Sequence, residues 1–382
     1  MNKYEEDLNY FLREIEKRHI WFYFDKSKKD LNSFVNEYLS THKLDSEYKL
    51  SYFIKCIIKY MLSIYDSHTF CFYNDVKSLL VELRFIKDDL YIINAFNEGL
   101  KYSKVLEINN FPVEKLISKI KKSLPYSTEA WLKARIESFF SDLNTINELS
   151  LTDSNKALFT VLKEGKKCKY ELFLDKQLKF KDDDNYDIAL LDNAIKIRYS
   201  KCAFPKVGNM LDFVKKLKRI SKDNNITNFI IDIRGNTGGN NTVIYPLLDF
   251  LKNSNFNVIT ITDRNVFSSG RFALIDLINI GSKTIGEDIG TSLNCFGNIK
   301  TFKLPNTNLT ITYSTKYFDY DPLNRKLIQY TTKDDMKSIK SFKPIFYKPD
   351  YYVCNSLEDY KNGDDKVIDE AVKVLNSYSH MM

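Results

Sequence analysis

The chain has 382 residues, of which 43% are hydrophobic, 14% aromatic and 28% charged. This composition excludes a mainly disordered chain, because so many apolar side chains can bury enough surface to offset the entropy lost on folding. The 12 glycines and 8 prolines exclude a collagen-like chain. The net charge of +7 comes from short lysine clusters rather than a continuous basic stripe, so we expect no nucleic-acid partner.

The cysteines and the apolar segments bear on the compartment. The six cysteines are widely spaced and form no Cys-x-x-Cys pair, so we expect free thiols, no metal site and a reducing environment. The N-terminal stretch mixes acids and bases and lacks the apolar core of a signal peptide. The longest apolar stretch, 52–65, is interrupted by Lys55 and Lys59, which argues against a transmembrane helix. These features predict a cytoplasmic protein without a membrane partner.

Residues 1–75 predict an N-terminal helical segment that ends in a strand. Apolar side chains within 1–65 recur near the 3.6-residue period of amphipathic helices, for example in YFLREIEKRHIWFYF (10–24). The sequence DSHTFCFY (66–73) then changes to the alternating, aromatic pattern of a strand.

Residues 76–180 predict a small α+β module, and the length of the chain leaves room for such an extra domain. The turn and helix-capping signals within it stand at Asp88–Asp89 (hairpin), Asn109–Asn110 (strand to helix), Ser127 or Thr128 (helix N-cap) and Glu164–Gly165 (hairpin). The charged stretch 179–187 is typical of a linker to the next domain.

Residues 186–382 predict the largest unit, an α/β core with mostly parallel strands. The segment NFIIDIRG (228–235) is almost continuously apolar, as in a strand that is buried on both faces of a sheet. Strand patterns alternate with helix patterns along this region, with strands at 194–204, 256–264 and 282–288 and helices at 208–224, 241–253 and 271–281. Such alternation is typical of a parallel sheet covered by helices.

Four histidines are candidates for a catalytic base. We expect His19, His42 and His380 at the surface, because they lie in a charged helix, a polar loop and the C-terminal tail. His68 differs, since it stands between a polar Asp–Ser pair and a strand, and a loop–strand boundary can present a side chain to a cleft.

The segment IIDIRGNTGGNN (230–241) leads from the buried strand into a glycine-rich turn. Gly238 and Gly239 could direct backbone N–H groups toward one point, as an oxyanion hole requires, or form a plain strand-to-helix turn. The string is neither a dinucleotide fingerprint nor a P-loop. We expect Asp232 and Arg234 to buttress the loop rather than to take part in chemistry.

The segment TDRNVFSSGRFALIDL (262–277) places two serines between a strand and a helix. A serine at such a turn lies at a helix N-terminus, in the topology that exposes nucleophiles in α/β enzymes. Ser268 or Ser269 could equally be only the N-cap of the helix. The GxSxG signature of the α/β-hydrolases is not present.

Together, DSHT, IIDIRGNTGGN, VFSSG and TIGED resemble the tail-specific, or C-terminal-processing, serine peptidase family, and its tricorn-core-like and retinoid-binding-protein-like branch in particular. That branch has a D-x-H-T segment, a strand reading I-D-[LI]-R-x-N-x-G-G, a T-x-S-x-[AG] turn and V-G-E. The resemblance covers most of the chain, and KVLEINNFPVEKLI (104–117) is similar to part of a degenerate PDZ-like unit. It implies a crotonase/ClpP-like α/β core beside an N-terminal helical segment and a small PDZ-like module.

The resemblance implies a role for each matching residue. Ser268 matches the nucleophile, with Ser269 as the fallback, and His68 matches the base. Gly238 and Gly239 match the glycine pair that supplies an oxyanion amide, with the Ser269 N–H as the other donor. The implied activity is that of a serine endopeptidase, which hydrolyses peptide bonds of unfolded or C-terminal protein segments through an acyl-enzyme and needs no cofactor.

The sequence departs from the family pattern at two points. The region where the lysine-dyad branch has its base reads GTSLNCFG (290–297) and holds no lysine. The carboxylate that orients the histidine has no recognisable motif, so Asp321, Asp334, Asp335 and Glu287 all stay candidates. We expect Glu287, which matches the V-G-E glutamate, to be structural rather than catalytic.

Two other function classes stay open. A non-catalytic protein with the same fold would hold a peptide or an apolar ligand, and the missing carboxylate favours it. Ser268 and His68 together favour an enzyme, because a purely binding cleft needs neither. An acyl-processing enzyme of crotonase-like architecture would use the glycine loop but leave the serine turn unexplained.

Overall fold

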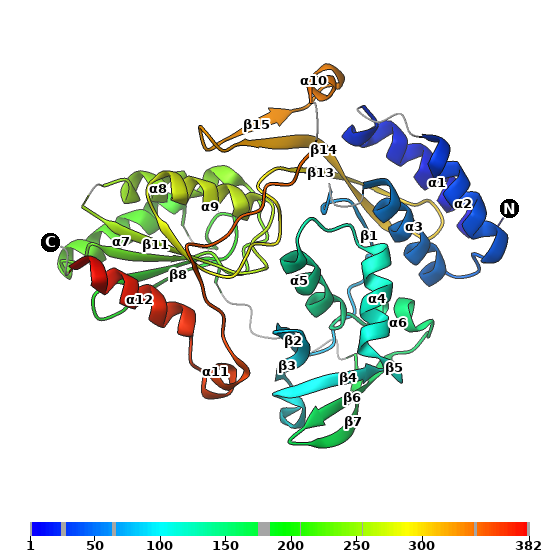
Figure 1. Cartoon of the computed structure of the whole chain (residues 1–382), viewed down its shortest axis with the longest axis horizontal. Helices are drawn as coiled ribbons and strands as arrows, with labels where there is room; N and C mark the ends of the chain where they lie inside the picture. The colour runs from blue at the N-terminus through cyan, green and yellow to red at the C-terminus, as the bar shows by residue number, and fades with distance from the viewer. Residues whose placement is uncertain are drawn as a thin grey trace. The chain divides into compact units, whose positions relative to one another are not determined.

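The computed structural model describes residues 2–23, 28–62, 66–174, 184–206, 208–253, 255–339 and 342–379. The chain folds into two compact units (Figure 1). Unit 1 comprises Met1–Lys179 and Leu293–Ile345, and unit 2 comprises Phe180–Ser292 and Phe346–Met382. The segment Leu293–Ile345 therefore groups with the N-terminal segments and not with the α/β core. The predicted boundary at 180 lies outside the described residues, and the three-part division of the sequence stays a prediction.

Unit 1 begins with the helices that the periodicity predicts. They are α1 (Lys3–Arg18), the 3-10 helix η1 (Ile20–Tyr23), α2 (Lys28–Thr41) and α3 (Glu47–Leu62). The Asn2 side chain caps α1 by accepting hydrogen bonds from the N–H groups of Tyr4 and Glu5. The helix ends at Arg18 rather than continuing to residue 24, because His19 adopts an extended backbone conformation.

An antiparallel sheet packs against these helices, in the order β1-β14-β13 with β15 also paired to β14. Its elements are β1 (Phe70–Phe72), β13 (Cys295–Lys303), β14 (Thr310–Asp321) and β15 (Lys326–Tyr330), followed by α10 (Lys333–Ser338). Ile54 and Ile58 of α3 share a hydrophobic core with Phe296 of β13 and Ile311 of β14. The sequence predicts only β1 of these strands.

The rest of unit 1 is a small module with a second antiparallel sheet, in the order β2-β3-β4-β6-β7 with β5 paired to β4. Its strands are β2 (Val81–Ile86), β3 (Asp89–Ala95), β4 (Ser103–Ile108), β5 (Phe111–Pro112), β6 (Lys156–Lys163) and β7 (Lys166–Phe173). Its helices are η2 (Glu98–Leu100), α4 (Val113–Ser123), α5 (Glu129–Phe139) and α6 (Leu143–Ser150).

Local turn chemistry explains most of this module. Asn109 and Asn110 both have positive φ, which asparagine tolerates, and they form the predicted turn. Thr128 is the N-cap of α5, since its hydroxyl accepts the N–H of Trp131. The first hairpin differs by one residue from the prediction, because Ile86 pairs with Asp89 and the loop is therefore 87–88.

Unit 2 holds the parallel-rich sheet, in the order β16-β12-β11-β10-β9-β8. Only the β8–β9 pair is antiparallel. The strands are β8 (Tyr186–Leu190), β9 (Ile195–Tyr199), β10 (Asn228–Asp232), β11 (Asn257–Thr262), β12 (Lys283–Gly286) and β16 (Tyr351–Tyr352). The helices are α7 (Met210–Asp223), η3 (Asn241–Ile244), α8 (Tyr245–Leu251), α9 (Ser269–Asn279), α11 (Leu357–Asn362) and α12 (Lys366–Ser379). A mixed α/β architecture with one parallel-rich sheet is thus confirmed.

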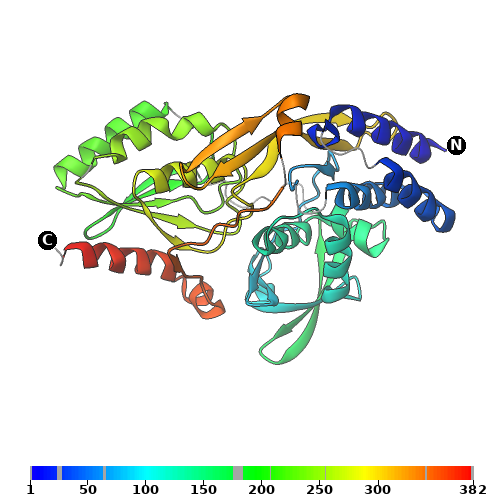
Figure 2. The same ribbon diagram turned by 45° about the horizontal axis from the view of Figure 1, so that its top comes forward.

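Helices cover both faces of the unit 2 sheet (Figure 2). Phe229 of β10 contacts Phe250 of α8, with 5.4 Å between the ring centroids. Ile230, the next residue of β10, belongs to the core that Ala371 and Leu375 of α12 fill. Every residue of β10 is buried, as the continuous apolar run predicts.

Arg234 connects α12 to the carboxyl end of β10. Its guanidinium donates to both carboxylate oxygens of Asp232, at 2.9 and 2.7 Å, and to both of Asp365, at 3.1 and 2.8 Å. Burial lowers the pKa of Arg234, but the two carboxylates outweigh burial and raise it overall. Arg234 and Asp232 therefore hold the start of the glycine loop against the helix that covers the sheet.

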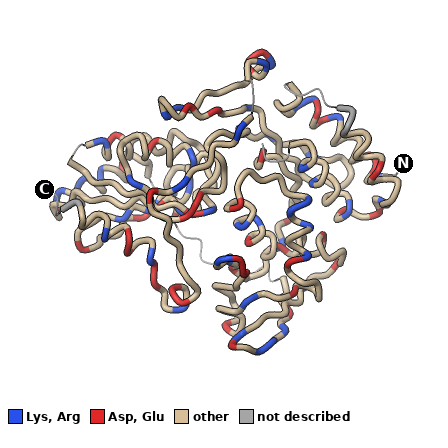
Figure 3. Tube along the Cα trace, viewed as in Figure 1, with Lys and Arg blue, Asp and Glu red and all other residues tan. Residues whose placement is uncertain are grey.

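The distribution of charge and the lengths of the helices bear on two expectations from the sequence, the lack of a basic stripe and the lack of a transmembrane helix. Figure 3 shows basic and acidic residues interspersed along the whole described trace rather than in one basic stripe. Among the described residues, no helix is long and apolar enough to cross a membrane.

We expect Arg234→Met to lower the free energy of unfolding by on the order of 2–3 kcal/mol, because it leaves two carboxylates without their charged donor. Arg219→Met removes an exposed arginine from α7 and should change it by less than about 0.5 kcal/mol. Urea denaturation of the two variants and the parent protein measures the difference. Equal stabilities would show that the Arg234 cluster does not hold α12 in place.

Candidate active site

Ser268 occupies a strained turn between β11 and α9. It is the N-cap residue of α9 with φ 49° and ψ −122°, a backbone conformation that costs energy for any residue except glycine. The turn is closed by hydrogen bonds from the N–H of Gly270 to the Phe267 carbonyl and from the N–H of Arg271 to the Ser268 carbonyl. The Ser268 hydroxyl makes no hydrogen bond to any residue that the structure describes. This sharp strand-to-helix turn is the kind that presents a nucleophile.

The glycine loop after β10 packs directly against this turn. A Cβ on Gly238 would lie 2.7 Å from the Ser268 Cβ and 2.7 Å from the Ser269 nitrogen, so only glycine fits. A Cβ on Gly239 would collide with the carbonyl of Cys202. Both glycines have positive φ, at 109° and 132°, which other residues rarely adopt. Four of the predicted site residues, Gly238, Gly239, Ser268 and Ser269, are therefore neighbours within unit 2.

The two glycine amides have different roles. The Gly238 N–H donates to the side-chain oxygen of Asn236 at 3.0 Å and is thus already used. The N–H groups of Gly239 and Ser269 make no hydrogen bond to any part of the chain that the structure covers. The Ser269 hydroxyl donates to the Gly239 carbonyl at 2.6 Å. Of the two serines, Ser268 therefore keeps an uncommitted hydroxyl, whereas Ser269 has its side chain committed to the loop.

Asn236 fixes the shape of the loop, and the sequence analysis does not single it out. Its side chain is completely buried and donates to the Tyr199 carbonyl at 2.9 Å. Its backbone carbonyl accepts the N–H of Phe267, and this bond joins the loop to the serine turn. Asp263 adds a second link, since it accepts the N–H groups of Gly235 and Asn265 at 3.0 Å each. The asparagine in the NxGG string is the one signal that could have indicated this role.

Glu287 has a structural partner. It forms a buried ion pair with Arg264, at the start of the serine turn. Its backbone N–H donates to the Thr262 carbonyl at 3.0 Å, and its carbonyl accepts the Thr262 hydroxyl at 2.8 Å. These contacts agree with the structural role expected for this residue.

His68 lies in unit 1, two residues before β1. Its backbone carbonyl accepts the Thr312 hydroxyl at 2.7 Å, which ties it to β14. Its imidazole packs over Gly297 of β13, where an added Cβ would lie 3.8 Å from the ring carbon Cε1. The side chain is only 6% exposed. The β13–β14 sheet thus positions the predicted base.

Asp66 is the carboxylate beside His68. Its Oδ1 accepts the backbone N–H of His68 at 2.7 Å and lies 3.8 Å from the imidazole Nδ1. Its Oδ2 accepts hydrogen bonds from His19 Nε2 at 2.8 Å and from the Thr69 hydroxyl at 2.7 Å. Burial raises the pKa of Asp66, but these hydrogen bonds and the two nearby imidazoles outweigh it and lower the pKa overall. Asp66 is therefore ionised and can stabilise a positive charge on His68.

The predictions for the other histidines need one correction. His19 is completely buried and bonded to Asp66, because the chain turns inward where α1 ends, so the surface prediction for it is wrong. His42 is exposed, as predicted. His380 lies outside the described residues.

The three aspartate candidates named from the sequence lie elsewhere. Asp321 caps the β14–β15 turn by accepting the N–H groups of Leu323 and Asn324. Asp335 belongs to the capping box of α10: its N–H donates to the hydroxyl of the N-cap Thr332, and its carboxylate accepts the Thr332 N–H. Asp334 pairs with Lys337 on the same helix. No hydrogen bond or ion pair connects any of the three to His68 in the described chain. Asp66 lies within the DSHT string itself. Its position two residues before His68 was the signal that could have identified it.

The comparisons with known proteins fit this arrangement. No protein-family model and no curated protein matches the chain. The structure of mature CPAF complexed with lactacystin matches with a TM-score of 0.69 and 11% identity, over 98% of this chain and 99% of that chain. Mature CPAF matches with a TM-score of 0.65 and 9% identity, over 97% and 96% of the two chains. The chain has the tail-specific peptidase fold.

A mutant of CPAF matches in the same way, with a TM-score of 0.63 and 10% identity over 94% of this chain and 95% of that chain. The resemblance drawn from the four short motifs is thus confirmed at the level of the fold. Among the residues that the structure describes, no group of three histidine, cysteine or acidic side chains is placed to hold a metal ion.

The contact between the glycine loop and the serine turn predicts a specific loss of stability. Gly238→Ala adds a Cβ that collides with Ser268 and the Ser269 nitrogen and must push the serine turn away from the loop. Gly235→Ala adds a Cβ into open space, also at a positive φ. We expect Gly238→Ala to cost about 1–3 kcal/mol more than Gly235→Ala, the usual cost of overpacking. Denaturation midpoints of the two variants measure it. Equal losses would mean that the loop and the turn do not pack as described.

The buried Asp66 predicts a pH-dependent stability. Because its pKa is lowered on folding, its stabilising charge is fully present above about pH 4 and is lost as the pH falls through the lower folded value. We expect Asp66→Asn to lose about 1–3 kcal/mol at neutral pH, and the gap to the parent protein to narrow below about pH 4. The exposed Asp153→Asn is the matched control and should show no gap. A gap that does not change with pH would contradict an ionised Asp66.

Proposed function

We propose that the protein is a serine endopeptidase that hydrolyses peptide bonds of unfolded or C-terminal protein segments. Ser268 is the nucleophile and His68 the general base in this proposal. The observation that carries it is the strained Ser268 turn, which combines a hydroxyl that has no hydrogen bond in the described chain with two amides in the same state. The tail-specific peptidase fold supports the proposal.

The chemistry is an acyl transfer to water. His68 would take the proton from Ser268 Oγ as that oxygen attacks the peptide carbonyl, and the N–H groups of Gly239 and Ser269 would bind the oxyanion that develops. Gly238 leaves the room for this arrangement and uses its own N–H to fix the loop. His68 would then protonate the leaving amine, and water would release the acyl group by the reverse sequence.

Asp66 would assist by stabilising the imidazolium that forms on His68. An ionised carboxylate 3.8 Å from the imidazole nitrogen favours the protonated ring. No step uses a metal ion or a cofactor, and the expected partner is the polypeptide substrate alone. We also propose that unit 2 is a crotonase/ClpP-like core and that the β2–β7 module is a degenerate PDZ-like domain. A cytoplasmic location is part of the same proposal.

Cleavage of casein by the purified protein tests this function. We expect Ser268→Ala to lower the rate by on the order of 10⁶-fold, because the nucleophile is lost, while Ser269→Ala keeps the nucleophile and both amides. A fluorophosphonate probe, which reacts with activated serines, should label the parent protein and Ser269→Ala but not Ser268→Ala. A second reporter is lactacystin, the compound in the CPAF complex, which we expect to slow casein cleavage.

The outcomes separate the alternatives. If the Ser268→Ala variant still cleaves casein, Ser268 is not the nucleophile. A parent protein that binds unfolded casein without cleaving it, and that no probe labels, would replace the peptidase by a non-catalytic binding protein with this fold. His68→Ala should abolish labelling as well, since the serine is a weak nucleophile without its base.

A further inference from the structure

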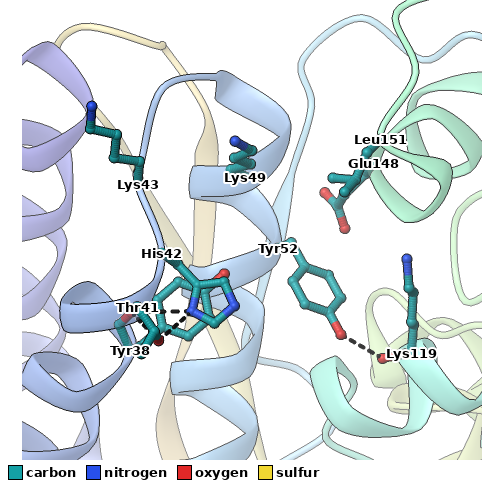
Figure 4. A pocket seen from close by; sticks show the side chains of 9 residues that line it. All are labelled: Tyr38, Thr41, His42, Lys43, Lys49, Tyr52, Lys119, Glu148 and Leu151. Atoms are coloured by element: carbon teal, nitrogen blue, oxygen red, sulfur yellow. Dashed lines mark hydrogen bonds between the residues drawn. The ribbon is translucent and has the colours of Figure 1, made fainter.

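Unit 1 contains several cavities with charged linings, and they differ in whether their charges are paired. A cavity of about 360 Å³ lies between α2, α3, α4 and α6. Figure 4 shows the side chains that line it. Lys49 there is paired with Asp45 at 2.8 Å, and the Lys119 ammonium donates to the Leu149 carbonyl at 2.6 Å. Both groups already have acceptors, and the third lysine of the lining, Lys43, is exposed to solvent, so this cavity gives no argument for an anionic ligand.

A second cavity, of about 180 Å³, lies along β1. Phe70–Tyr73 form one side of it, and Arg135 and Phe139 of α5 form another. Among the described strands, β1 pairs only with β14, so no strand occupies its other edge. This volume is enough for one side chain of a bound polypeptide.

Arg135 is the distinctive group of this cavity. Its guanidinium carbon lies 4.4 Å from the ring centroid of Phe139, 5.5 Å from those of Phe70 and Trp131, and 6.0 Å from that of Phe72. It forms neither a hydrogen bond nor an ion pair with any residue described by the structure. Burial lowers the pKa of Arg135 to about 10.

Lys55, the other lining cation, is already paired, since it donates to both carboxylate oxygens of Glu148, at 2.9 and 2.8 Å. Asp142 caps α6 by accepting the N–H of Thr145 at 3.1 Å with Oδ2, while its buried Oδ1 has no hydrogen-bond partner in the described chain. Its charge raises the pKa of Arg135, but burial outweighs it. Arg135 is thus the lining cation that forms no ion pair with a described residue. Aromatic rings contact its faces but cannot satisfy its N–H donors.

The cavity is close to the predicted base along the chain. Phe70 and Phe72 follow His68 by two and four residues, and an extended chain advances about 3.3 Å per residue. The cavity wall therefore lies within about 7–13 Å of His68. A polypeptide that pairs with the open edge of β1 would direct alternate side chains toward one face. A side chain a few residues from the cleaved bond would reach this cavity.

We propose that the cavity is a substrate subsite that takes an acidic side chain, glutamate or aspartate, and pairs its carboxylate with the Arg135 guanidinium. The proposal rests on the proposed function, because it assumes that the ligand is the polypeptide substrate. A guanidinium and a carboxylate form two parallel hydrogen bonds, and the aromatic collar excludes water from the pair. The methylene groups of the acidic side chain would contact Phe70 and Phe139.

Binding to an inactive protein tests the subsite without requiring cleavage. The chain has two tryptophans, so Ser268→Ala combined with Trp21→Phe leaves Trp131, in the collar of Arg135, as the single tryptophan whose emission reports binding. The probes are short Ala–Ser peptides, acetylated and amidated at their ends, with one central Glu or Gln. We expect the Glu peptide to bind about 10-fold more tightly, which corresponds to 1.4 kcal/mol.

Substitutions then assign the preference to Arg135. Arg135→Met should remove the difference between the Glu and Gln peptides, and Arg135→Lys should keep part of it, since a lysine retains the charge but not the paired geometry. Lys133→Met is the matched control, because Lys133 lies on the same helix and donates instead to the Lys87 carbonyl at 2.7 Å. It should leave the preference unchanged.

The results also separate the subsite from the peptidase proposal. Equal binding of the Glu and Gln peptides to the Trp131 reporter protein overturns the subsite, whether or not the parent protein cleaves casein. Tight binding only of peptides with a free C-terminal carboxylate overturns it too, because the ligand is then not a side chain. A Glu preference in a protein that does not cleave casein keeps the cavity as an acidic-peptide site and overturns the peptidase alone.

Discussion

The glycine loop and the Ser268 turn approach so closely in unit 2 that no side chain fits between them. Parallel strands β10 and β11 end at the same edge of the sheet, so the loops that follow them meet there. Gly238 allows the contact, and the Phe267–Asn236 and Gly235–Asp263 hydrogen bonds hold it. The positive φ of Ser268 persists because these surroundings leave the turn no other conformation. The uncommitted hydroxyl of Ser268 and the two uncommitted amides follow from this one contact.

Unit 1 builds the histidine side by a different device, a buried carboxylate. Asp66 collects hydrogen bonds from the end of α1, through His19, and from its own loop, through Thr69 and the His68 backbone. An ionised carboxylate in a dry interior is costly unless such donors surround it. The loop before β1 is thereby fixed, and the imidazole of His68 takes its place over β13. Each half of the proposed site is therefore shaped by contacts within its own unit.

The sequence predicts most of what depends on local chemistry. The glycine loop and the Asn109–Asn110 turn are short strings whose residues tolerate positive φ, and the serine turn is a short string between a strand and a helix; each lies where predicted. Burial of His19 escapes prediction, because it depends on a contact with Asp66 that is 47 residues away in the chain. The strands β13–β15 escape it too, since the burial pattern of β13 does not alternate and so lacks the period-two signal.

Two arginines show how burial and partners together indicate a role. Arg234 is held between Asp232 and Asp365, and its charge is fully compensated, so it acts as a joint between a strand and a helix. Arg135 has aromatic neighbours and no ion pair with a described residue, and a desolvated cation in that state gains from an incoming anion. The glycine-rich string around Arg234 indicates a structural role for it, whereas nothing in the sequence of α5 marks Arg135. The difference in partners arises from which segments the fold brings to each guanidinium, and this is why the cavity along β1 could be recognised from the structure alone.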